Sequence, residues 1–275
     1  MARDLTHIIQ DRLHVAPWQH LSTSRLPGVN PLDWTDWLIK DEVFADQMAY
    51  RDQLLATRRD QVFAASEGTK ETCQELLGLV VEKLRGVPGY EFSANTVTRP
   101  DGVSVALDAD HPLITAGRLV QQDFCIMVRE AQEHVLRAGI LCFPSNWKLG
   151  EKMNQPMSVI HDPVVRYDAA LTKRVQRIFD HIKPDRPVWR ANFLNYTTAN
   201  LFQPDREKKV DRDAGKWVRV ERQSLVRLPR SGDLVFGIHT HVIPMASLTP
   251  EDRAVFLAEW EDHYDYAKDR PALEG

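Results

Sequence analysis

The chain has 275 residues, of which 43% are hydrophobic and 27% are charged, as in an ordinary globular protein. Its 35 Lys and Arg against 39 Asp and Glu give a formal net charge of −4, so it has no basic excess that would drive nonspecific binding to nucleic acid. The sequence contains no signal-peptide core and no run of about 18 apolar residues, so we expect a cytoplasmic protein without a membrane span.

The cysteines and glycines exclude several common site types. Cys73, Cys125 and Cys142 lie far apart and form no C-x-x-C pair, which argues against a zinc knuckle, a thioredoxin-type site and a disulfide scaffold. Neither G-x-G-x-x-G nor G-x-x-x-x-G-K-[ST] occurs, so a nucleotide bound through those loops is not the leading expectation.

The first ninety residues are predicted to form an irregular arm followed by a helical layer. Prolines interrupt the arm, which covers residues 1–30. The layer covers residues 31–90, where apolar side chains recur at spacings of three and four. Its clearest helices are expected over 44–55 and 69–84.

A sheet-containing core is predicted over residues 91–245. Two short stretches rich in Val and Thr, Ser93–Thr98 and Gly102–Leu107, flank a Pro-Asp-Gly turn and indicate a hairpin. Apolar spacing over Val120–Leu136 predicts a helix, and a short apolar strand is expected over Ala138–Phe143.

The rest of the chain combines helices with longer strands. Asp168–His181 has the spacing of an amphipathic helix, and a C-terminal helix is expected over 249–268. Three further strands are predicted over Val188–Leu194, Trp217–Leu228 and Leu234–Val242.

This order of elements indicates a single α+β domain over residues 1–275. No internal repeat, low-complexity tract or Gly/Ser linker divides the chain. We therefore expect a mostly antiparallel sheet covered by helices, with an N-terminal helical layer.

One candidate ligand is His161, which follows Val159 and Ile160 and precedes Pro163. The proline stiffens the backbone at a point where an imidazole could be presented to a metal or cofactor. A buried histidine that is hydrogen-bonded to a carbonyl or to Asp162 explains the same pattern, and the local sequence leaves both interpretations open.

Polar side chains occupy two of the predicted strands. Because strand side chains alternate, Arg190 and Asn192 lie on one face, and Glu221 lies with Arg219 on the face opposite Arg222. Charge on both faces of a strand is unusual for a simple core. Hydrogen bonds and ion pairs between neighbouring strands are the alternative explanation.

His239 and His241 would share one face of the last predicted strand. Two histidines at this spacing can bind a metal ion, so a mononuclear metal site competes with the other interpretations. Histidines that face solvent from an edge strand are the simpler alternative.

Several ordered motifs resemble the haem-dependent oxidative N-demethylase family. The matching segments are Leu141–Trp147, Lys152, Ile160–Val164, Pro187–Phe193 and Arg219–Pro229. Together with residues near Asp41 and Arg51, they extend the resemblance roughly from Pro31 to Pro244. The resemblance implies a PAS-like sheet that binds haem, and oxidation of a small methylated amine such as dimethylamine by dioxygen.

The resemblance also implies roles for the candidate residues. His161 becomes the expected axial ligand of the haem iron, with His239 or His241 as the second choice. The catalytic candidates, which would stabilise bound oxygen or hold a cationic amine, are Arg190, Asn192 and Glu221. The candidates for the propionates and the polar shell of the cofactor are Arg222, Lys148, Lys152 and Arg227.

The implied cofactor is haem b, and the products are the demethylated amine and formaldehyde. Three cysteines cannot supply the four thiolates of an ordinary iron–sulfur cluster, and no dinucleotide fingerprint is present. Electrons are therefore expected from a separate NAD(P)H-dependent reductase with flavin and iron–sulfur centres. Two alternatives remain: a haem-based PAS-like gas or redox sensor, and a non-haem metalloenzyme that uses His239 and His241.

Overall fold

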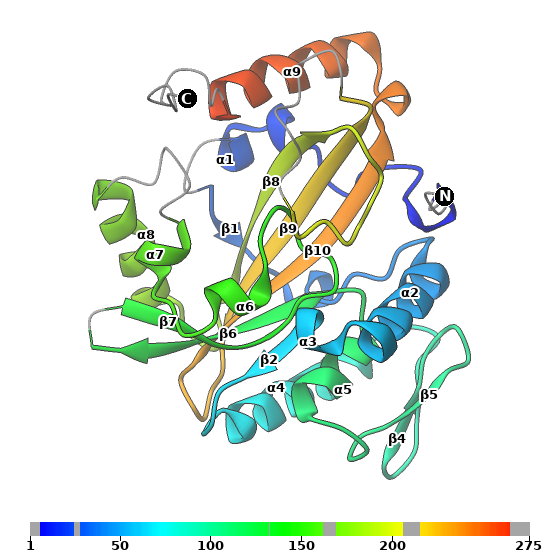
Figure 1. Ribbon diagram of the computed structural model, residues 1–275, viewed down its shortest axis with the longest axis vertical. Coiled ribbons are helices and arrows are strands. Elements are labelled where there is room, and N and C mark those ends of the chain that lie inside the picture. Colours follow the sequence, from blue (N-terminus) through cyan, green and yellow to red (C-terminus); the bar gives the residue numbers. More distant parts are fainter. Residues whose placement is uncertain (1–5, 25–27, 132, 162–168, 206–214, 265–275) are drawn as a thin grey trace, which may run out of the picture.

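The computed structural model describes residues 6–24, 28–131, 133–161, 169–205 and 215–264. Its centre is a sheet in which every neighbouring pair of strands is antiparallel (Figure 1). In spatial order the strands are β1 (Asn30–Pro31), β8 (Val188–Tyr196), β9 (Trp217–Arg227), β10 (Leu234–Pro244), β6 (Asp123–Glu130), β7 (Glu133–Ile140) and β2 (Phe63–Ala65). The predicted α+β class with a mostly antiparallel sheet is confirmed.

Strands β9 and β10 form a long hairpin at the centre of the sheet. They pair along their whole lengths, from Leu234 opposite Arg227 to Pro244 opposite Trp217. The turn between them is closed by Gly232, whose φ of +75° lies in the left-handed region that glycine tolerates. The three strands predicted in this half of the chain are confirmed.

The segment predicted as a helix over Val120–Leu136 is instead most of the β6–β7 hairpin. Phe124 and Ile126 point to one face of the sheet and Cys125 and Met127 to the other, and all four side chains are buried. A strand covered on both faces has a nearly continuous apolar sequence, so its periodicity does not distinguish it from a buried helix. The helix prediction is wrong for this reason.

Helices from the first half of the chain cover one face of the sheet, here called the N-terminal face. They are α2 (Phe44–Thr57), α3 (Arg59–Val62), α4 (Lys70–Leu84) and α5 (Pro112–Leu119). Their apolar side chains share a core with Phe124, Val226 and Val235 of the sheet. A separate small antiparallel sheet, β3 (Glu91–Phe92), β4 (Thr96–Thr98) and β5 (Ser104–Ala106), contains the predicted hairpin.

The N-terminal arm and the last helix cover the rest of the same face. The short elements of the arm are η1 (Thr6–Ile8), η2 (Pro17–Gln19) and α1 (Leu21–Ser24), and η3 (Trp34–Asp36) follows β1. Trp18 of the arm packs edge-on against Phe193 and Phe256. Phe256 belongs to α9 (Pro250–Tyr264), which follows η4 (Met245–Ser247) and lies across one end of β8–β10 (Figure 1). Residues 265–268 of the predicted C-terminal helix lie outside the described residues.

The opposite face of the sheet, here called the α7 face, is covered by α6 (Leu149–Lys152), α7 (Met157–His161) and α8 (Ala169–His181). Met157 and Ile160 of α7 pack on an apolar cluster that includes Leu225 and Ile238 of the sheet. No helix in the described part of the chain is long and apolar enough to cross a lipid bilayer.

His134 of β7 is a buried histidine whose ring lies against the Gln176 side chain. Burial lowers the pKa of His134 to about 4. The Gln176 side chain accepts from the His134 backbone N–H through Oε1 and places its Nε2 donor 2.8 Å from Nδ1, a contact that requires an unprotonated Nδ1.

We expect the protein to lose stability as pH falls from about 6.5 towards about 4, partly through His134. The unfolded chain binds a proton at this side chain near its ordinary pKa, whereas the folded chain resists protonation, so unfolding takes up a proton in this range. Thermal unfolding midpoints of wild type and His134→Gln measured at several pH values will test this. An equally steep loss of stability in both proteins would contradict the assignment to His134.

Candidate functional site

A row of polar side chains crosses three strands on the α7 face. The register places Asn192 of β8 opposite Glu221 of β9, and Glu221 opposite Thr240 of β10. In the adjacent row Arg190 lies opposite Gln223, and its guanidinium donates to the Gln223 amide oxygen at 2.7 Å. The sheet therefore brings the three predicted catalytic residues, Arg190, Asn192 and Glu221, onto one face.

Glu221 is the centre of this polar row and is only 7% exposed. Its carboxylate accepts hydrogen bonds from Asn192 Nδ2 at 3.2 Å, from Gln223 Nε2 at 3.3 Å and from Arg219 Nε at 3.3 Å. Hydrogen bonds to a charged carboxylate are usually about 2.7–2.9 Å long. The carboxylate thus has remaining capacity for a stronger donor.

Arg219 holds the row against the loop that follows β7. Its guanidinium is buried and donates to the carbonyl of Leu201 at 3.1 Å and to that of Phe143 at 2.6 Å. Its contact with Glu221 is made through Nε, so Arg219 neutralises the carboxylate without enclosing it. The alternation of the strand predicted the face of Arg219, but the sequence gave no reason to rank it among the site residues.

Two buried polar atoms beside Glu221 have no partner in the part of the chain that the structure describes. Asn192 Oδ1 and Thr240 Oγ1 have no hydrogen-bond partner among the described residues. They belong to the side chains on either side of Glu221 in the same row. Since buried polar groups in native proteins are almost always satisfied, this row has the character of a binding surface for a polar ligand.

The predicted axial ligand His161 is the last residue of α7. Its side chain lies outside the described residues. The helix packs on the apolar cluster around Leu225 and Ile238, which lies on the same face as the polar row. The role of His161 as a metal ligand therefore stays a prediction. Its helix, α7, lies on the same face of the sheet as Glu221.

The predicted cofactor-binding cations do not form one group. Lys148 pairs with Asp205 at 2.8 Å at the surface, and Lys152 donates to the Ile160 carbonyl of α7 at 3.2 Å. Arg222 lies on the N-terminal face, where its guanidinium stacks over Trp189. The fourth, Arg227, donates to the carbonyls of Phe179, Ile182 and Gly232, which ties the end of α8 to the β9–β10 turn.

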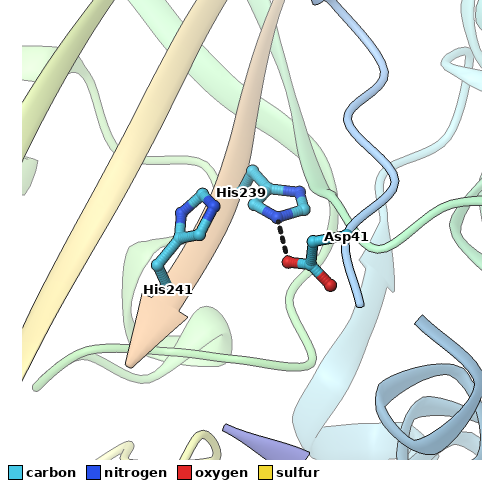
Figure 2. Close-up of side chains that lie close together, drawn as sticks. All are labelled: Asp41, His239 and His241. Carbon is cyan, nitrogen blue, oxygen red and sulfur yellow. Dashed lines mark hydrogen bonds and ion pairs between the residues drawn. The ribbon is translucent and has the colours of Figure 1, made fainter. Parts of the chain in front are cut away.

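A second cluster lies on the N-terminal face and contains Asp41, His239 and His241 (Figure 2). One potential ligand atom of each side chain lies within 4.8 Å of the other two. His239 Nε2 is 3.1 Å from Asp41 Oδ2. Both histidines are almost fully buried, so the prediction that they face solvent is wrong. β10 lies between β9 and β6 in the sheet, although β6 pairs with it only as far as Ile238.

Asp41 is held in place by amide donors. Gln10 Nε2 donates to Oδ2 at 2.8 Å and Gln121 Nε2 donates to Oδ1 at 2.6 Å. Although burial alone would raise the pKa of Asp41, the hydrogen bonds from His239 and the two amides hold it well below its usual range. The carboxylate is therefore ionised at neutral pH.

His241 is buried, and no described residue forms a hydrogen bond with its ring. Neither ring nitrogen has a partner among the described residues. Burial and the neighbouring His239 lower the pKa of His241 well below its ordinary value, so its ring is neutral at pH 7. The exposed His14 stacks on it with a centroid distance of 6.2 Å. A neutral imidazole, which has one nitrogen lone pair to donate, is the form that binds metal ions.

The sequence did not indicate that Asp41, Gln10 and His14 belong to this second cluster. They come from the arm and from the segment before α2, about 200 residues away along the chain from β10. Local spacing reveals only the two histidines on one strand.

The fold and the two clusters define an α+β protein with buried polar groups on both faces of a central antiparallel sheet. A family model described as haem-dependent oxidative N-demethylase, alpha subunit-like, matches residues 28–266. The chain belongs to this family, whose name describes an oxidative enzyme that depends on haem. The resemblance found in the sequence is thereby confirmed.

Proposed function

We propose that this protein uses haem b and dioxygen to oxidise a small methylated amine, giving the demethylated amine and formaldehyde. The observation that carries the proposal is the α7 face of the sheet, where an apolar cluster borders the partly satisfied Glu221 carboxylate. An apolar surface suits a porphyrin, and a buried carboxylate suits an ammonium group.

The residues on this face fit the donor set that a haem requires. His161 ends α7 and would supply an imidazole that holds the haem iron, as in other proteins whose haem iron is held by histidine. Leu225 and Ile238 would contact the porphyrin ring. Lys152, which donates to the Ile160 carbonyl of α7, and the exposed Lys148 would be available to the haem propionates.

Bound haem would supply reductive activation of dioxygen, so that one oxygen atom enters an N-methyl group and the other leaves as water, at the cost of two electrons and two protons. The residues of the chain then have three tasks. Glu221 would bind the protonated amine, and Asn192 Oδ1 would accept a second N–H of the same group. Arg190, ordered by Gln223, would direct positive charge towards oxygen.

Electrons would come from a separate NAD(P)H-dependent reductase that contains flavin and iron–sulfur centres. The family's name describes an alpha subunit, which supports the idea of a separate partner chain. The three cysteines of this chain are buried, and burial raises the pKa of each thiol to about 12 or above. They are poorly suited to holding a cluster of their own.

The proposal is tested by absorption spectroscopy of protein expressed with ample haem precursor. We expect a Soret band that shifts when dimethylamine is added. When dioxygen is supplied together with an external electron donor that delivers two electrons per turnover, we expect formaldehyde in equal amount to the amine consumed. A protein that stays colourless after haem reconstitution would contradict the proposal.

The ligand assignment has its own prediction. We expect His161→Ala to lose its haem or to show the spectrum of an iron without an imidazole ligand, because the axial bond is the main protein contact of the iron. The matched control is His181→Ala, the histidine that ends α8, which should keep the wild-type spectrum. Unchanged haem content and spectrum in His161→Ala would move the axial ligand to another residue.

A further inference from the structure

We propose that Asp41, His239 and His241 bind one divalent transition-metal ion, at a site separate from the haem site proposed above. Each side chain contributes one potential ligand atom, and these atoms lie within 4.8 Å of one another. Figure 2 shows the Asp41 carboxylate and the two rings gathered beside β10.

The donor set determines the class of ion. Two imidazoles and one carboxylate suit Zn²⁺, Fe²⁺ or Co²⁺, whereas Mg²⁺ and Ca²⁺ prefer oxygen ligands throughout. Three protein ligands leave at least one coordination position for water or another small ligand. The site thus resembles a mononuclear centre with an open position.

The spacing of the two atoms in contact also fits a shared ion. Ligand atoms bonded at about 2.0–2.1 Å lie about 2.8–3.0 Å apart at octahedral angles and about 3.3–3.4 Å apart at tetrahedral angles. His239 Nε2 and Asp41 Oδ2 are 3.1 Å apart. This pair needs little movement to accept a metal ion between them.

The unsatisfied nitrogens point to a missing partner. Both ring nitrogens of His241 are buried and have no hydrogen-bond partner among the described residues. His241 is only 2% exposed. A metal ion bonded to His241 would satisfy a lone pair that nothing else in the described part of the chain approaches.

The groups around the ligands already have the arrangement of an outer shell. Gln10 and Gln121 donate to the two oxygens of Asp41 and so fix the direction of its carboxylate. The backbone N–H of Gln10 donates to the Val242 carbonyl at 3.0 Å, and the backbone N–H of Val242 donates to Gln10 Oε1 at 2.9 Å. An ion here would tie the arm, the segment before α2 and β10 to one another.

The sheet separates this site from the polar row. His239 and His241 point to the N-terminal face, and Thr240 between them points to the α7 face beside Glu221. A ligand seated on Glu221 therefore lies across the sheet from His241. One positive group, the Arg222 guanidinium, lies near the histidines and will reduce the affinity for a cation.

The experiment is a Zn²⁺ titration of haem-loaded protein by calorimetry after removal of loosely bound metal with a chelator. Elemental analysis of the dialysed complex would accompany it, with haem iron measured separately. We expect one Zn²⁺ per chain in wild type. His241→Ala and Asp41→Asn should weaken binding by at least about 100-fold, and Gln121→Ala by about 10- to 100-fold. Haem content should stay unchanged in all three.

The matched control is His134→Gln, which replaces a buried strand histidine outside the cluster and should bind Zn²⁺ like wild type. Asp41→Asn is nearly isosteric and decides the matter if His241→Ala does not fold. Zn²⁺ should also raise the thermal unfolding midpoint of wild type and not that of Asp41→Asn. Absence of stoichiometric binding in wild type, or equal affinity in Asp41→Asn, would overturn the proposal. Loss of haem together with Zn²⁺ in His241→Ala would overturn it too, because the histidine would then belong to the haem.

Discussion

Replacing Glu221 with glutamine is expected to weaken the binding of methylated amines by about 10- to 100-fold. The substitution keeps the shape of the side chain but removes the negative charge that the proposed ammonium ligand requires. A hydrogen bond to a charged group is worth about 1.5–3 kcal/mol, and each 1.4 kcal/mol is about a tenfold change in affinity.

The contacts of Glu221 explain why its charge is available to a ligand. Its three protein donors lie at 3.2–3.3 Å, and Arg219 makes its contact through Nε, whereas its terminal nitrogens donate to backbone carbonyls. An ammonium group could therefore form a shorter hydrogen bond to the carboxylate without displacing Arg219. Asn192 and Thr240 supply further acceptors on either side.

The measurement is an amine titration of the haem spectrum for wild type, Glu221→Gln and Glu221→Asp. Glu221→Asp keeps the charge and should retain part of the affinity. Carbon monoxide, a neutral ligand of reduced haem, serves as the control and should bind the three proteins alike. If Glu221→Gln binds dimethylamine as tightly as wild type, the carboxylate does not hold the amine.

The sequence predicted the strands that carry the polar row, and the alternation of their side chains predicted the faces correctly. Arg190, Asn192 and Glu221 lie together and Arg222 lies on the other face, as a period of two requires. The alternation can be recognised in the sequence because these strands contain both polar and apolar residues. The continuous apolar sequence of β6 provides no such contrast, so it was mistaken for a helix.

The second cluster could be predicted only in part because it depends on long-range packing. The sequence showed His239 and His241 on one strand, but their carboxylate partner Asp41 reaches them only after the segment before α2 packs against β10. Burial of the two histidines has the same origin, since β6 pairs with β10 only as far as Ile238 and Gln10 of the arm covers the edge beyond it. Neither fact has a local sequence signal.

The most damaging single substitution outside the polar row is expected at Arg51 of α2. Its guanidinium is fully buried and donates to Asp123 at 2.7 Å and to the carbonyls of Gly117, Gln121 and Gln122. The sequence showed Arg51 within an apolar helical stripe, where an unpaired charge would be very unfavourable. The four acceptors account for its position.

Arg51→Met should lower the free energy of unfolding by about 3–5 kcal/mol, because it leaves the buried Asp123 carboxylate without its counter-ion. The exposed pair Arg59–Asp110 offers a matched control with equally short contacts, 2.6 and 2.8 Å. Arg59→Ala should cost less than about 1 kcal/mol, since solvent screens that pair. Urea unfolding at neutral pH will measure both values, and equal losses would show that burial does not govern the Arg51 pair.

Arg51→Met should also affect the proposed amine site. The Asp123 carboxylate accepts the backbone N–H groups of Cys142 and Phe143, each at 2.8 Å, and the Phe143 carbonyl in turn accepts from Arg219, the partner of Glu221. Loss of Arg51 frees Asp123 to reorient, which loosens the loop that holds Arg219 in place. Arg51→Met should therefore weaken amine binding under conditions where it is still folded, whereas Arg59→Ala should not. Unchanged amine affinity in folded Arg51→Met would limit Arg51 to stabilising the fold.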